Sequence, residues 1–187
     1  VEAYVCKASN ILTDAIALKA IQMIGKHLVP AVKTHNEESL DAMMAASTMA
    51  GMAFGNSDVA SVHSISEALG GFYDIPHGVA NAMMLAPVSR LSISGNPQKY
   101  ADVAAALGID TKNMSVIEAA NAGVDLMQKM ADELEIPHFK DLDIIDPKDF
   151  DRLAKTAANA DETFDNPVLM DQSDFKKLFE DLYNEGK

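Results

Sequence analysis

Helix start and stop signals recur along this 187-residue chain, whereas strand signals are nearly absent. No run of β-branched residues alternates with polar ones, and no Asn-Gly or Asp-Gly pair joins two such runs as a hairpin turn would. Such a chain has little with which to build a sheet, because period-2 alternation is what gives a strand one buried face. We therefore predict an all-α, bundle-like fold that forms a single domain over 1–187.

The first long helix is predicted over 13–28, where Thr13 serves as the cap and Asp14 is a first-turn acid. Pro30 is expected to end or kink this helix, since proline removes a backbone donor. The apolar stripe that should face the core comprises Ile16, Ala20, Met23, Ile24 and Leu28.

Asn36, followed by two acids, predicts the start of a second helix that turns into a run of Met, Ala, Ser and Gly. Because that run is apolar on nearly all sides, we expect it to be buried. Its small residues should let neighbours approach closely, namely Ala46, Ala50, Gly51 and Ala53. Another helix is expected from about 57 to 69, stopped by Gly70-Gly71 and followed by a turn through Asp74 and Pro76 into the next. Later helices are expected at 97–107, 115–135, 147–159 and 172–184.

The composition narrows the range of partners. With 48% hydrophobic residues and a formal net charge of −13, the chain is an acidic globule, so nucleic acid and anionic membranes are excluded as partners. The single cysteine, Cys6, rules out an internal disulfide and indicates a reducing, cytoplasmic location. No apolar run reaches roughly 20 residues and no signal peptide is visible, so no membrane span is predicted.

Two of the five histidines, His63 and His77, flank a glycine-rich reversal that can bring their imidazoles together. Neutral imidazole binds zinc, iron(II), nickel or copper, but a metal site needs three or four ligands. Glu67, one helical turn after His63, or Asp74 in the turn could complete the site or accept a hydrogen bond from a ligand histidine. The alternative is a polar network that pins the turn. The other three histidines, His27, His35 and His138, are interpreted as structural.

Nucleotide-binding and hydrolase motifs are missing from the chain. It contains no GxGxxG, GxxxxGKS, GxSxG or HExxH sequence. We therefore expect that it cannot hold a dinucleotide by itself.

The stretch "VHSISEALGGFYDIPHGVANAMMLAPV" resembles the iron-containing, or group III, alcohol dehydrogenase family. The resemblance extends over "EAYV", "TDAIALKAIQMI", "AGMAFGN", "NPQKYADVAAALG" and "AANADETFDNP", and so covers essentially the whole chain. It implies a dehydroquinate synthase-like protein of two domains, of which this chain is the carboxy-terminal, helical, metal-binding one. The amino-terminal nucleotide-binding α/β domain, which would hold NAD(P), is then absent from the chain.

The resemblance also implies a divalent metal, Fe²⁺ or another such as Zn²⁺, with four protein ligands. Two of them are His63 and His77, and the others belong to a DxxxH motif expected immediately before "EAY". Since "VEAYV" reads as the last turns of a helix, we expect a fragment of a longer protein. The metal would act as a Lewis acid on the substrate oxygen while hydride passes to or from the nicotinamide.

Two further positions take roles from the resemblance. Phe54 aligns with a residue that lines the substrate pocket, although a core phenylalanine is the alternative. Glu67 stands where many members carry a histidine suited to proton relay, and it is our candidate catalytic residue.

The function implied is one half of an NAD(P)-dependent enzyme that interconverts small alcohols or diols and aldehydes. The resemblance also suggests a homodimer, and the isolated chain is expected to be inactive. The alternative is a non-catalytic helical module from a split or truncated reading frame.

Overall fold

Helices form all the regular structure of residues 1–185, the part of the chain that the computed structural model describes, and no strand occurs among them. The all-α prediction is confirmed. The α-helices are α1 (Glu2–Val5), α2 (Ile11–Thr34), α3 (Glu37–Phe54), α4 (Ser61–Tyr73), α5 (His77–Ser92), α6 (Pro97–Ala106), α7 (Val116–Glu133), α8 (Phe150–Ala158) and α9 (Gln172–Asn184). Short 3₁₀ helices lie at Ile93–Gly95, Phe139–Asp141, Pro147–Asp149 and Asp161–Asp165.

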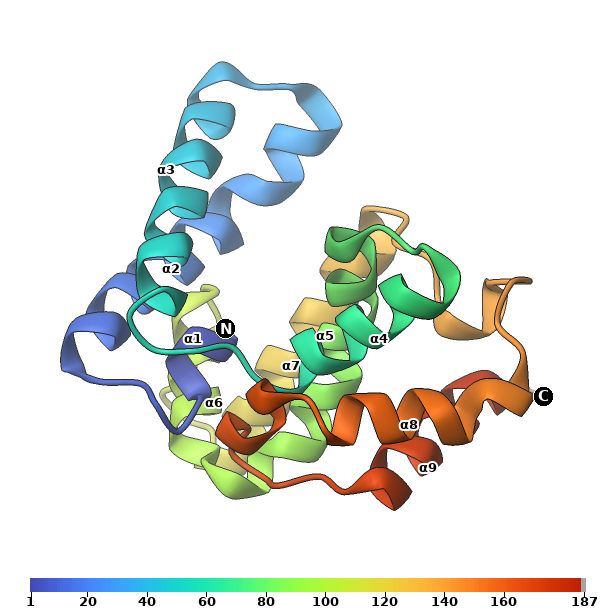
Figure 1. Cartoon of the computed structure of the whole chain (residues 1–187). Helices are drawn as coiled ribbons and strands as arrows, with labels where there is room; N and C mark the ends of the chain where they lie inside the picture. The colour runs from blue at the N-terminus through green and yellow to red at the C-terminus, as the bar shows by residue number, and fades with distance from the viewer. Residues whose placement is uncertain (186–187) are drawn as a thin grey trace.

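Two apolar cores share helix α5. The first gathers α4, α5, α8 and α9 around the aromatic rings of Phe139, Phe150 and Phe179, whose centroids are 5.7 to 6.0 Å apart. The second gathers α1, α2, α6 and α7. Leu85 of α5 packs against both cores, so this helix joins the two halves of the molecule (Figure 1).

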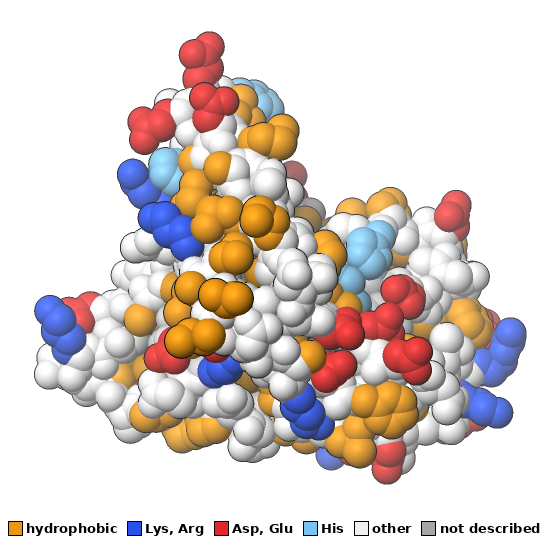
Figure 2. All heavy atoms as spheres, turned by 60° about the vertical axis from the view of Figure 1, so that its left-hand side comes forward, with side chains coloured by type: hydrophobic (Ala, Val, Ile, Leu, Met, Phe, Trp, Pro, Cys, Tyr) orange, Lys and Arg blue, Asp and Glu red, His pale blue; other side chains and the backbone are white. Residues whose placement is uncertain are grey.

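Helices α2 and α3 pair as an arm that stands away from the rest of the molecule (Figure 1). The prediction that the Met- and Ala-rich helix α3 is buried is wrong, because only Ser39, Ala46 and Ala53 are buried in it. One face of α3 packs on α2, and its C-terminal end meets α1, while much of the opposite face is exposed. Met44, Met52 and Phe54 are therefore 72%, 54% and 49% exposed. Figure 2 shows hydrophobic side chains along this arm.

Helix α2 begins earlier and ends later than predicted. Its cap is Asn10, whose side chain accepts hydrogen bonds from the amides of Leu12 and Thr13, while the Thr13 hydroxyl accepts from the Asn10 amide. Pro30 lies inside the helix without ending it. The last turns of α2 pack on α3, and Ala31 is buried there. This packing outweighs the loss of the backbone hydrogen-bond donor at Pro30. Within the predicted stripe, only Ala20 is fully buried.

Helix α4 also differs from the prediction of 57–69, since it starts at Ser61 and runs through Gly70-Gly71. The residues before it form a turn, in which the Ser57 hydroxyl donates to the Ala53 carbonyl over 3.0 Å. The helix ends instead at Asp74, which adopts the left-handed conformation with φ 55°. The other predicted helices are confirmed to within a few residues, except that 147–159 begins as a 3₁₀ turn.

By length and composition alone, α2 is apolar enough to cross a bilayer, with a mean hydropathy of 1.2. The expectation that no segment reaches this threshold is therefore wrong for α2. One such helix near the N-terminus is weak evidence for a membrane span, because core helices of soluble proteins meet the same criteria.

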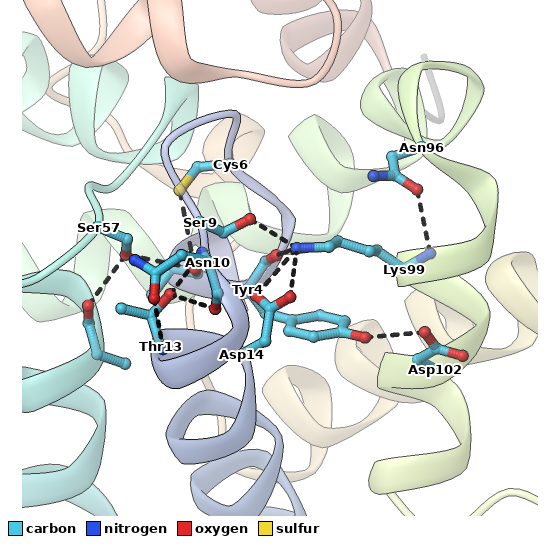
Figure 3. A network of polar contacts seen from close by, with 12 residues as sticks. Tyr4, Cys6, Ser9, Asn10, Thr13, Asp14, Ser57, Asn96, Lys99 and Asp102 are labelled. Carbon is cyan, nitrogen blue, oxygen red and sulfur yellow. Dashed lines mark hydrogen bonds and ion pairs between the residues drawn. The ribbon is translucent and has the colours of Figure 1, made fainter.

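The ammonium group of Lys99 holds α1 in place (Figure 3). It donates to the Tyr4 carbonyl and the Ser9 hydroxyl, each over 2.6 Å, and to the Asp14 carboxylate over 2.9 Å. It also lies 4.6 Å from the centre of the Tyr4 ring. The Tyr4 hydroxyl donates to Asp102, and burial, together with this carboxylate, raises the pKa of Tyr4 above its ordinary value. The short helix α1 is thus tied to both α2 and α6.

Close packing of α6 on α7 gives a first prediction. A Cβ atom added at Gly123 would lie 2.9 Å from the Cβ atom of Ala104, whereas one at Gly51 would meet open space. Alanine is the better helix former by about 1 kcal/mol, so Gly51→Ala should raise the free energy of unfolding. Gly123→Ala should lower it by about 1–3 kcal/mol through overpacking. Urea unfolding of both variants tests this, and a stabilised Gly123→Ala would show that the helices separate readily.

The Lys99 contacts give a second prediction. Lys99→Met keeps an apolar stem but leaves the partly buried Asp14 carboxylate without its cation. We expect the free energy of unfolding to fall by about 2–3 kcal/mol, the range for hydrogen bonds to charged groups. Lys19→Met is the control, since Lys19 is exposed and, among the residues described, its ammonium group hydrogen-bonds only to Gln22, so its loss should stay within about 0.5 kcal/mol. Equal effects in thermal unfolding would contradict the role of Lys99.

Candidate metal-binding site

His63 and His77 lie side by side on neighbouring helices. His63 is in the first turn of α4 and His77 is the first residue of α5, after the reversal through Asp74 and Pro76. Their ring centroids are 5.2 Å apart, with 59° between the ring planes. The predicted proximity of the two imidazoles is confirmed, whereas their role as ligands stays a prediction.

Each imidazole has a partner on its Nδ1 atom. His63 Nδ1 contacts the carboxylate of Glu2, from α1. His77 Nδ1 lies 3.1 Å from the Ser66 hydroxyl, which also donates to the His77 carbonyl. The amide nitrogen of Asn81 lies 2.9 Å from His77 Nε2 and 3.4 Å from His63 Nε2. Both Nε2 atoms therefore face the same point.

Sequence reasoning missed the three residues that hold the imidazoles. Asn81 had a local signal, since it stands four residues after His77, within one helical turn, whereas Ser66 contacts a histidine 11 residues away. Glu2 had none, because 61 residues separate it from His63.

The two imidazoles of His63 and His77 are suitable ligands for a divalent metal, but they do not form a complete ligand set. Imidazole nitrogen is a ligand for zinc and iron(II). Within residues 1–185, however, no group of three or more His, Cys, Asp or Glu side chains is arranged to hold a metal ion. The histidine pair fits half of a four-ligand set, and neither Glu67 nor Asp74 completes it.

A cavity of about 290 Å³ opens beside His63, between α1, α3, α4 and α5. Phe54 lines it together with His63, Glu2 and Asn81, and the remaining wall is apolar. Phe54 is thus no core residue, because half of its side chain is exposed at the end of α3. Neither Glu67 nor His77 lines this cavity.

Glu67 is exposed on α4, one turn after His63, and makes no hydrogen bond or ion pair within the described part of the chain. The three remaining histidines have structural surroundings, as expected. His27 contacts the Ser39 hydroxyl over 3.2 Å, and His138 lies 3.4 Å from Asp132. His35 caps α2 in the left-handed conformation.

Known proteins are similar to this chain in sequence and in fold. The 1,3-propanediol dehydrogenase of Citrobacter freundii is 36% identical over 185 residues, which cover 98% of this chain and 48% of that protein. Alcohol dehydrogenase 4 of Schizosaccharomyces pombe is 38% identical over 184 residues, which cover 96% and 42% of the two chains. The chain spans about half the length of these relatives or less.

Solved structures agree with the sequence matches. The crystal structure of a 1,3-propanediol oxidoreductase superposes with a TM-score of 0.93 at 36% identity, covering 97% of this chain and 48% of the other. The model of the Fe-containing alcohol dehydrogenase family, C-terminal, matches residues 1–183. The chain therefore belongs to the Fe-containing alcohol dehydrogenase family and represents its C-terminal helical region.

Proposed function

We propose that this chain is the metal- and substrate-binding half of an NAD(P)-dependent alcohol dehydrogenase that interconverts small alcohols or diols and aldehydes. The observation that carries the proposal is the pairing of His63 with His77 beside a cavity that Phe54 lines. The relatives support the substrate class, because they include a 1,3-propanediol dehydrogenase and a lactaldehyde reductase.

The residues divide the work as follows. His63 and His77 hold the metal, Fe²⁺ or another divalent ion such as Zn²⁺, through their Nε2 atoms. Once bound, the metal supplies Lewis acidity at the substrate oxygen. Phe54 and the apolar wall of the cavity receive the carbon chain of the substrate and exclude water from it. The exposed carboxylate of Glu67 relays the hydroxyl proton to solvent.

The remaining parts come from outside the described residues. Two further metal ligands would come from a DxxxH motif immediately before "EAY", and the NAD(P) site from an amino-terminal nucleotide-binding domain that packs beside the cavity. The exposed side chains of α3 support this arrangement, because Phe54, which lines the cavity, and Met52, two residues before it, are about half exposed. Assembly as a homodimer and a cytoplasmic location are part of the same proposal.

Metal binding tests the histidine pair. The purified chain should bind Zn²⁺ through His63 and His77, and a His63→Ala/His77→Ala double variant should lose this binding. Because two ligands hold a metal loosely, we expect partial occupancy that EDTA removes readily. Isothermal titration and metal analysis after dialysis measure both effects.

The control is a His35→Ala/His138→Ala double variant, which removes a histidine at the end of α2 and one beside Asp132 and should bind as the unaltered chain does. Equal zinc binding by the two double variants would contradict the site. Stoichiometric metal that survives extensive EDTA dialysis would contradict the expectation of a half-complete ligand set.

Activity tests the division into two domains. The purified 187-residue chain should reduce no aldehyde with NADH or NADPH, because no dinucleotide-binding motif lies in it. The same residues joined to an amino-terminal nucleotide-binding domain of a relative should show turnover, measured by the loss of absorbance of the reduced cofactor. Turnover by the chain alone would refute the division.

A further inference from the structure

Glu2 is a buried carboxylate with both oxygens occupied. Its side chain is 8% exposed, although a buried charge is unfavourable unless it is paired and hydrogen-bonded. One oxygen accepts a hydrogen bond from the backbone amide of Val62 over 2.8 Å, and the other contacts His63 Nδ1. Because a carboxylate accepts and does not donate, His63 must carry its proton on Nδ1. In the neutral imidazole, the form that binds a metal, Nε2 of His63 is then the unprotonated nitrogen.

Ser66 imposes the same tautomer on His77. Its hydroxyl has a single proton, which it donates to the His77 carbonyl over 3.1 Å. The hydroxyl oxygen can then only accept at His77 Nδ1, also over 3.1 Å. His77 thus also leaves Nε2 unprotonated.

The orientation of Asn81 is compatible with the same tautomers. Its amide nitrogen, a donor, faces both Nε2 atoms, whereas its Oδ1 is buried without a partner. With the amide in this orientation, its NH₂ group donates to both Nε2 atoms, which agrees with Nδ1–H tautomers at both histidines. Glu2, Ser66 and Asn81 therefore agree on one protonation pattern, although they come from three different helices.

We propose that Glu2 is a positioning residue that fixes His63 as the Nδ1–H tautomer and aims its Nε2 lone pair, with Ser66 doing the same for His77. The inference rests on the proposed role of these histidines as metal ligands. Partners of this kind orient a ligand imidazole and raise its basicity. The carboxylate is needed because both the Val62 amide and His63 Nδ1–H require an acceptor.

Glu2→Gln tests this requirement at constant shape. Glutamine has one acceptor oxygen, so when that oxygen serves the Val62 amide, its NH₂ group faces His63 Nδ1. His63 should then move to the Nε2–H tautomer, while His77 keeps its own. Long-range ¹H–¹⁵N NMR of histidine-labelled, metal-free chain in mildly alkaline buffer reads each tautomer directly. Glu133→Gln, the same change at an exposed acid of α7, is the matched control and should alter neither histidine.

Zinc titration gives the second reading. Glu2→Gln should weaken Zn²⁺ binding by about 10- to 100-fold, the range for loss of a residue that orients a ligand, whereas Glu133→Gln should bind normally. Unchanged tautomers and unchanged zinc affinity in Glu2→Gln would overturn the inference.

Two further measurements keep the test decisive. If Glu2→Gln fails to fold, the unaltered chain still decides, because an Nε2–H signal from its His63 overturns the inference. Ser66→Ala, a small change on the other imidazole, should release the tautomer of His77 alone. A chain that binds no zinc through His63 and His77 would contradict the proposed function instead, since the tautomers are read without metal.

Discussion

The ammonium group of Lys99 joins three stretches of chain at one point, and the position of α1 depends on it. A helix of four residues has no stability of its own, because its nucleation cost exceeds what so few hydrogen bonds return. Its place is set by the bond from Lys99 to the Tyr4 carbonyl and by the bond from the Tyr4 hydroxyl to Asp102. These contacts therefore also fix the positions of the other side chains of α1 (Figure 3).

What α1 carries is the Glu2 carboxylate, which lies at the start of α4. Ala60, the cap residue of α4, has no side-chain acceptor. The Glu2 carboxylate instead accepts the hydrogen bond from the Val62 amide. A negative charge is favourable at this end of a helix, where the backbone dipoles leave partial positive charge. The Glu2 side chain therefore both caps the start of α4 and orients the imidazole of His63.

Helix starts that depend on contacts between residues close in sequence could be predicted, whereas features that depend on contacts between distant residues could not. Asn36 and Asp171 cap helices through amides two or three residues away, and these starts were predictable. Glu2 acts across 60 residues, which explains why both the start of α4 and the partner of His63 were missed. The burial of α3 was misjudged because composition tells how apolar a helix is, and not whether a neighbour covers it. The resemblance of the histidine motif identified the family, which no single spacing could.

The arm of α2 and α3 makes the stability of the molecule uneven. Because α3 buries only three side chains, its outer turns lose few contacts when they open, whereas α4 and α5 are seated in an aromatic core. Segments of this kind open at a lower free energy than the whole domain. We therefore expect the outer turns of the arm, where α2 meets α3, to open locally and to exchange their amide hydrogens faster than the rest (Figure 1). His63 and His77 lie on α4 and α5, so the pair is expected to keep its geometry during such opening.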